Sequence, residues 1–223
     1  MDTKLFISAI VKFIFGFIIV GLLIFLPAGT INYQNGLLFM GLLFIPMFIA
    51  GIVMMFKDPD LLRRRLNAKE KESEQKEVLL LSALMFILGF VLAGLNYRYE
   101  WTTLPNIITI VSSVIFILAY IMYAEVLREN SYLSRTISVD NNQKLVDTGM
   151  YSVVRHPMYT VTIILFLMIP LILGSIISLI VFLIYPFIIV KRIKNEEIVL
   201  EKDLKGYKEY KKKVKYRLIP YIW

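Results

Sequence analysis

Residues 157–190, PMYTVTIILFLMIPLILGSIISLIVFLIYPFIIV, form an apolar run without a single charged residue. A helix needs about 20 apolar residues to cross the core of a bilayer, so this run is too long for one crossing. Leu173-Gly174-Ser175 lies at its middle and is typical of a tight turn. The run therefore predicts a helical hairpin with limbs of about 16 residues, roughly 25 Å each, which is marginal for a full crossing.

Four further apolar segments precede the hairpin: Leu5–Leu26, Gly36–Phe56, Val78–Leu95 and Ile107–Leu127. Apolar residues make up 58% of the 223-residue chain and charged residues only 19%, which is unlike a soluble domain. The first segment is longer than the core of a signal peptide, so we interpret it as a retained span. The predicted fold class is all-α integral membrane, with four transmembrane helices plus the C-terminal hairpin, or five to six membrane segments.

Basic residues occur in alternate connections between these segments. The connection 96–106 holds only Arg98, and the connection 27–35 holds none. The other connections and the tail are rich in Lys and Arg: Lys57, Arg63, Arg64, Arg65, Lys69, Lys71 and Lys76; then Arg128, Arg135, Lys144 and Arg155; and eleven more from Lys191 to Arg217. By the positive-inside rule we expect both termini and the basic loops to be cytosolic, on the cell membrane if the host is prokaryotic. This placement explains the net charge of +8 without nucleic acid.

The chain divides at residue 127 into two predicted regions. Residues 1–127 would hold the four transmembrane helices and the cytosolic loop 57–77, and residues 128–223 a cytosolic loop, the hairpin and the tail. The chain has no cysteine and one histidine, so it offers little material for a metal centre, and we expect no metal. The expected partners are membrane lipids.

The hairpin should bring together two polar clusters, because an antiparallel hairpin returns its end to its beginning. Tyr151 to Tyr159 lies at its entry, and Arg192 to Glu197 at its exit. Pro157 suits the first turn of a helix and would leave Arg155 and His156 beside unpaired backbone N–H groups that favour an anion. At the exit, Arg192 and Glu196 stand four residues apart and would pair on one helical face. Each of these residues, taken singly, is more typical of a membrane anchor or a solvated charge than of a functional site. Together they indicate a pocket at the membrane boundary.

The tail carries an apolar stripe at helical spacing. Such a stripe predicts an amphipathic cytosolic tail helix lying on the membrane, interrupted at Gly206, and this helix would also be placed to roof the pocket. Its members are Ile193, Leu200, Leu204, Tyr207, Tyr210 and Val214.

These motifs resemble one family. Arg155-His156-Pro157-Met158-Tyr159, Arg192 with Glu196-Glu197, Tyr207 with Tyr210, and Arg217-Leu218-Ile219-Pro220 occur in the order seen in the isoprenylcysteine carboxyl methyltransferase and phospholipid N-methyltransferase family. Asn130 to Arg135 and Asp147 to Tyr151 are similar to its bacterial and archaeal branch. The resemblance covers roughly residues 127–223.

The resemblance implies methyl transfer from S-adenosylmethionine to a lipophilic or prenylated acceptor at the cytosolic membrane face, most like isoprenylcysteine carboxyl O-methylation. It implies catalytic roles for Arg192, Glu196 and Glu197. It also implies that the cofactor is bound by Arg155, His156, Tyr159, Tyr151 and Glu197.

Other functions remain open at this point. One is N-methylation of a phospholipid amine, and another is a nicotinamide-dependent reductase of membrane lipids. The loop Asn130–Tyr151 has only Arg135 and Lys144 to meet a nicotinamide phosphate, which argues mildly against a reductase. A non-catalytic membrane protein is the third, but a transporter would be expected to show repeated halves, and no repeat is visible.

Overall fold

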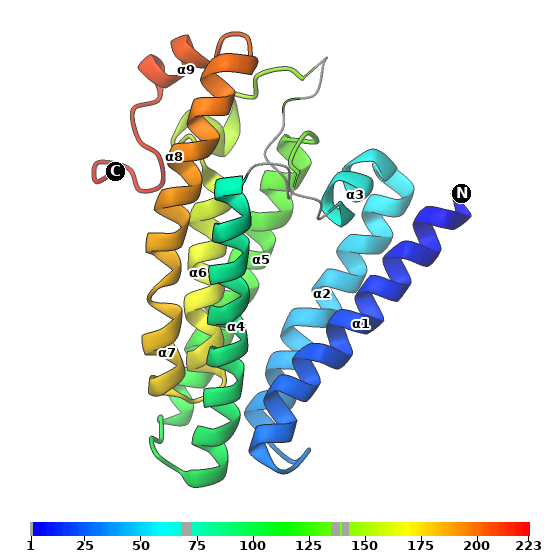
Figure 1. Ribbon diagram of the computed structural model, residues 1–223, viewed down its shortest axis with the longest axis vertical. Helices are drawn as coiled ribbons and strands as arrows, with labels where there is room; N and C mark the ends of the chain where they lie inside the picture. Colours follow the sequence, from blue (N-terminus) through cyan, green and yellow to red (C-terminus); the bar gives the residue numbers. More distant parts are fainter. Residues whose placement is uncertain (1, 68–72, 135–138, 140–142) are drawn as a thin grey trace.

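The computed structural model describes residues 2–67, 73–134, 139 and 143–223. Three of the basic residues that predict the orientation, Lys69, Lys71 and Arg135, lie outside the described residues. The described chain is helical without strands (Figure 1). The elements are α1 Thr3–Ala28, α2 Gln34–Lys57, α3 Pro59–Leu66, α4 Ser73–Tyr99, α5 Asn106–Glu129, the 3₁₀ turn η1 Gly149–Ser152, α6 Pro157–Ile172, α7 Ile176–Phe182, α8 Tyr185–Asp203 and α9 Tyr207–Lys213.

Five stretches are long and apolar enough to cross a membrane: α1, α2, Gln75–Tyr99, α5 and Ile176–Asp203, the last joining α7 and α8. The remaining apolar helix, α6, is shorter. Many apolar side chains on these helices point outward, such as Phe15, Ile45 and Ile121, each more than 60% exposed. A soluble protein would not expose so much apolar surface, whereas lipid tails would cover it. The predicted fold class is confirmed.

The hairpin forms as predicted, with limbs of unequal length. Gly174 adopts φ of 74°, a left-handed conformation that glycine reaches at no steric cost, and so ends the first limb. The first limb, α6, has the predicted 16 residues. The second limb continues through α7 and α8 to Asp203, because the helix runs on into the charged segment beyond the apolar run.

Close helix contacts depend on small residues. A Cβ at Gly94 of α4 would lie 2.4 Å from the carbonyl oxygen of Ile24 in α1, and a Cβ at Gly89 would lie 2.3 Å from the ring of Phe182 in α7. Glycine at these positions lets the backbones approach, as is usual between membrane helices. Helix α4 therefore joins the α1–α2 pair to the hairpin.

The tail differs from the prediction. The stripe is interrupted as expected, since Gly206 has φ of 87° between α8 and α9. However, the expectation that it lies on the membrane is wrong for Leu204, Tyr207, Tyr210 and Val214. These side chains are buried in the protein, packed against Leu200 and the loop residues Val139 and Leu145. Burying the stripe against the loop removes its apolar area from water, as membrane contact also would.

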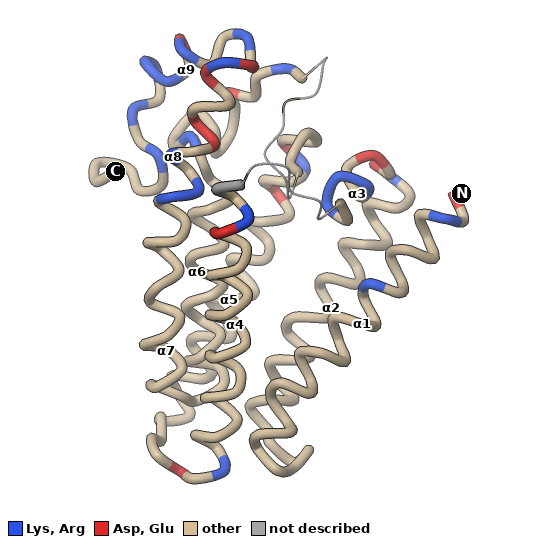
Figure 2. The backbone as a smooth tube through the Cα atoms, in the orientation of Figure 1, with Lys and Arg blue, Asp and Glu red and all other residues tan. Residues whose placement is uncertain are grey.

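Charge separates the two ends of the molecule. Figure 2 shows that basic and acidic residues gather at the end that holds α3, α9 and both termini. The opposite end has the connections 29–33 and 100–105 and the hairpin turn (Figure 1). The tail, η1 and the entry to α6 all lie at the charged end, which is where a polar site has to form.

Candidate active site

Glu197 of α8 links the hairpin entry to its exit. Its Oε1 accepts a hydrogen bond from Arg155 Nε at 2.8 Å and lies 3.3 Å from His156 Nε2. Its Oε2 accepts from Arg217 Nε at 3.0 Å, and Lys211 Nζ lies 3.7 Å away. The side chains of Glu197 and Arg155 are only 3% and 4% exposed. The two predicted clusters therefore do meet, around one buried carboxylate.

The tail closes over the hairpin entry through backbone hydrogen bonds. The N–H groups of Arg155 and His156 donate to the carbonyls of Tyr216 and Arg217. Arg155 Nη1 also donates to the carbonyls of Val214 and Lys215, at 2.7 and 2.8 Å. The N–H groups of Arg155 and His156 are therefore paired, and in the first turn of α6 those of Tyr159 and Thr160 donate to the carbonyl of His156.

Tyr159 connects Arg192 with Glu196, which the sequence predicts to pair. Arg192 Nε donates to the Tyr159 hydroxyl at 2.7 Å, and that hydroxyl donates to Glu196 Oε2 at 2.5 Å. The predicted contact of Arg192 with Glu196 thus runs through Tyr159. Arg192 Nη1 also donates to Oε1 of buried Gln75 at 3.3 Å, which fixes α8 against the start of α4.

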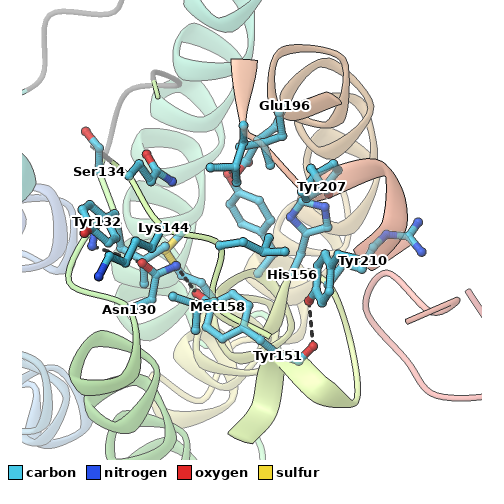
Figure 3. A pocket seen from close by; sticks show the side chains of 18 residues that line it. Asn130, Tyr132, Ser134, Lys144, Tyr151, His156, Met158, Glu196, Tyr207 and Tyr210 are labelled. Carbon is cyan, nitrogen blue, oxygen red and sulfur yellow. Dashed lines mark hydrogen bonds between the residues drawn. The ribbon is translucent and has the colours of Figure 1, made fainter. Parts of the chain in front are cut away.

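A cavity of about 90 Å³ adjoins Tyr159 and Glu196 and lies between α8, α9, η1, the entry to α6 and the loop (Figure 3). Of the predicted site residues, Tyr151, Arg155, His156, Tyr159 and Glu196 line it. Arg192 and Glu197 are not among the lining residues, but each forms a hydrogen bond with a residue that is, Arg192 with Tyr159 and Glu197 with Arg155. The remaining lining residues are Asn130, Tyr132, Leu133, Ser134, Gln143, Lys144, Leu145, Val146, Met158, Leu200, Leu204, Tyr207 and Tyr210.

Tyr207 lines the cavity, and its hydroxyl group forms no hydrogen bond with the described residues. Its side chain is buried. Burial raises the pKa of Tyr207 above its ordinary value, and the nearby Glu197 carboxylate raises it further. The hydroxyl therefore remains a protonated donor. A buried donor without an acceptor is costly, so it marks a place for a ligand oxygen or nitrogen.

Tyr151 has a different role in the wall. Its hydroxyl accepts from Asn130 Nδ2 at 3.2 Å, and its carbonyl accepts from the Tyr210 hydroxyl at 2.6 Å. Burial raises the pKa of the Tyr151 hydroxyl, so it too remains neutral. Tyr151 thus ties the loop to α9 across the cavity.

Sequence reasoning did not assign a site role to Asn130, Lys144 or Tyr207. Asn130 and Lys144 lie in a loop without periodicity, so no spacing pointed to them. Tyr207 belongs to the apolar stripe, which predicts membrane contact and a helix placed to roof the pocket, and to a family motif, but neither pattern indicates a role for its hydroxyl. Among the described residues, no group of three metal-ligating side chains is present.

The fold and the site define an all-helical membrane protein with a pocket beside the end of its C-terminal hairpin, lined by several tyrosines together with Arg155, His156 and Glu196. Residues 96–202 match the model of the isoprenylcysteine carboxyl methyltransferase family. The matched region begins at the end of α4 and includes α5, the loop, the hairpin and most of α8. No curated protein matches the chain. The family is named for methyl transfer to the carboxyl group of isoprenylcysteine.

Proposed function

We propose that the protein transfers a methyl group from S-adenosylmethionine to the carboxylate of a lipophilic, prenylated acceptor at the cytosolic face of the membrane. The observation that carries the proposal is the pocket of Arg155, His156, Glu196 and Tyr207, which lies within and next to the region matching the family. Residues 128–223 form this pocket, and residues 1–127 provide the membrane scaffold beside it. The basic residues at the end of the molecule that holds both termini support a cytosolic orientation (Figure 2).

The lining fits the polar groups of the methyl donor. Arg155 and His156 are cationic or proton-donating partners for its carboxylate, and Glu196 is an acceptor for its amino group. The unpartnered Tyr207 hydroxyl is a donor for a further ligand oxygen or nitrogen. The cavity of about 90 Å³ is smaller than the 300–1,000 Å³ of ordinary ligand sites, so the pocket must widen on binding. Outward movement of residues 143–146 is the simplest way, since they form one wall.

The methyl donor supplies an electrophilic methyl group: a carboxylate oxygen bonds to the methyl carbon while the carbon–sulfur bond breaks and its electron pair stays on sulfur. No proton has to be moved, so the chain's residues contribute by alignment and by excluding water. Glu197 orients Arg155 and His156, and Arg192 orients Tyr159 and Glu196. The buried residues of α9 close the pocket from water. In this assignment Glu196 contacts the donor, whereas Arg192 and Glu197 are positioning residues.

Calorimetric titration of the purified full chain in detergent tests the proposal. We expect binding of S-adenosylmethionine and none of NADPH. Tyr207→Phe should weaken that binding by about tenfold or more, because it removes a donor that only the ligand satisfies. Tyr216→Phe is the matched control, since Tyr216 lies in the tail but outside the pocket lining. Wild-type protein that does not bind S-adenosylmethionine would overturn the proposal, and binding of NADPH instead would favour a reductase.

A further inference from the structure

Helix α3 is held against the side of the pocket. Asp58 caps its start by accepting from the N–H of Leu61 at 3.0 Å. Lys12 of α1 donates to the carbonyl of Leu66 at its end, at 2.7 Å. A cation at a helix C-terminus is favourable, which accounts for a lysine within the first membrane segment. The helix is thus fixed in place at both ends, and its side chains have defined directions.

The three consecutive arginines of α3 occupy three different environments. Arg63 is about half exposed and forms ion pairs with Asp2 at 2.8 Å and Asp60 at 2.5 Å. Arg64 donates to the carbonyl of Ser131 at 3.0 Å and lies over the ring of Tyr132. Only Arg63 therefore behaves as an ordinary surface arginine.

Arg65 points toward the pocket. Its Nη1 lies 3.7 Å from the sulfur of Met158, and its Nη2 donates to the hydroxyl of Tyr123, over whose ring the guanidinium also lies. Met158 is a pocket-lining residue and is shown in Figure 3 next to the loop. Arg65 is therefore next to the pocket edge, on the side of α3 and α5.

No carboxylate neutralises Arg65 within the described part of the chain. The carboxylates of α5 and Glu196 of α8 have other partners: Glu125 binds Arg128, Glu129 accepts from Thr148 and the N–H of Met150, and Glu196 accepts from Tyr159. Arg65 is only partly exposed, so water screens its charge incompletely. A partly buried guanidinium with a thioether and a phenol as its contacts retains donors for an anion.

We propose that Arg65 binds the carboxylate of the lipophilic acceptor at the edge of the pocket. The inference rests on the proposed function and deepens it, because it names the residue that selects an anionic acceptor over an amine. The planar guanidinium matches a carboxylate and repels an ammonium group. A carboxylate has about four lone-pair sites, so an oxygen held by Arg65 still has electron pairs free to form the new bond to carbon. Met158, which is unbranched and flexible, can move aside to let the bound group face the pocket.

Binding of N-acetyl-S-farnesyl-L-cysteine and of its uncharged methyl ester to the purified full chain tests the inference. We expect the wild-type protein to bind the carboxylate more tightly than the ester, by about 10- to 100-fold, as for a charge-assisted hydrogen bond. Arg65→Gln should remove this preference. Arg63→Gln is the matched control: it removes the same charge two residues away, from an arginine already paired with aspartates, and should keep the preference.

A wild-type protein without the preference, or an Arg65→Gln protein that retains it as Arg63→Gln does, would overturn the inference. If Arg65→Gln does not fold, Arg65→Lys replaces it. The lysine keeps the charge but loses the planar fork, so we expect several-fold weaker binding of the carboxylate, and an unchanged affinity contradicts the inference. Calorimetry with S-adenosylmethionine is done separately on the same samples. If the wild-type protein does not bind S-adenosylmethionine, that result counts against the proposed function. The comparison of the two arginine variants does not depend on it, because the acceptor is titrated without the methyl donor.

Discussion

Glu197→Gln tests whether the buried carboxylate holds the hairpin and tail together. Three cations surround this side chain within 3.3 Å: Arg155, His156 when protonated, and Arg217. Glutamine keeps one oxygen acceptor but turns an amide NH₂, which is a donor, toward the remaining cations. Arg155 would then stay buried without a full counter-charge.

The expected cost follows from these contacts. Removing one partner of a buried ion pair costs about 3–5 kcal/mol. Arg155 keeps its hydrogen bonds to the carbonyls of Val214 and Lys215, which favours the lower end, about 3 kcal/mol. For a chain of this size, that loss of unfolding free energy lowers the melting temperature by about 6–12 °C.

Thermal unfolding in detergent, followed by tryptophan fluorescence, measures this shift. Glu201→Gln is the control on the same helix, since Glu201 pairs with Lys211 near the surface and should contribute about 1 kcal/mol or less. If Glu197→Gln melts within about 2 °C of both the wild type and Glu201→Gln, the reasoning that a buried hub holds the site together is refuted.

Three further predictions concern the scaffold and its orientation. Gly94→Ala should lower the melting temperature by the equivalent of about 1–3 kcal/mol, because its methyl group would meet the α1 backbone at 2.4 Å, whereas Gly16→Ala, with nothing within 4 Å, should be neutral; equal melting temperatures would contradict this. Asn96→Ala should cost about 2–3 kcal/mol, because buried Asn96 hydrogen-bonds the N–H, hydroxyl and carbonyl of Thr102, and unfolding with urea measures it; a cost below about 0.5 kcal/mol would count against the contact. Since the chain has no cysteine, single cysteines at Thr103 and Lys212 report orientation in intact cells: a membrane-impermeant maleimide should label Thr103→Cys directly and Lys212→Cys only after permeabilisation, and the reverse pattern would place the termini outside.

Much of the site was predictable because a hairpin is a strong geometric constraint. The turn at Gly174 and the apolar limbs sufficed to predict that Arg155 and His156 meet the glutamates, and they do, at Glu197. Which of the two glutamates contacts Arg155, and which contacts Tyr159, was not predictable. Adjacent residues on a helix point about 100° apart, so only one could face Arg155 while the other faced Tyr159 and the pocket. Which one does so depends on how α8 is rotated, and packing against α4 and α6 sets that rotation.

The sequence by itself determined the membrane class, the hairpin and the polar clusters at its ends, because these follow from local hydropathy, charge and turn residues. The tertiary structure alone decided the role of the tail and of α3. The tail's stripe has the same spacing whether it faces lipid or the loop, and only the fold shows that Tyr207 is buried with its hydroxyl unpaired. Likewise, three identical arginines in a row become an outer ion pair, a loop contact and a cation at the pocket edge because α3 presents them in three directions. Such differences arise from contacts distant in sequence, which no local pattern encodes.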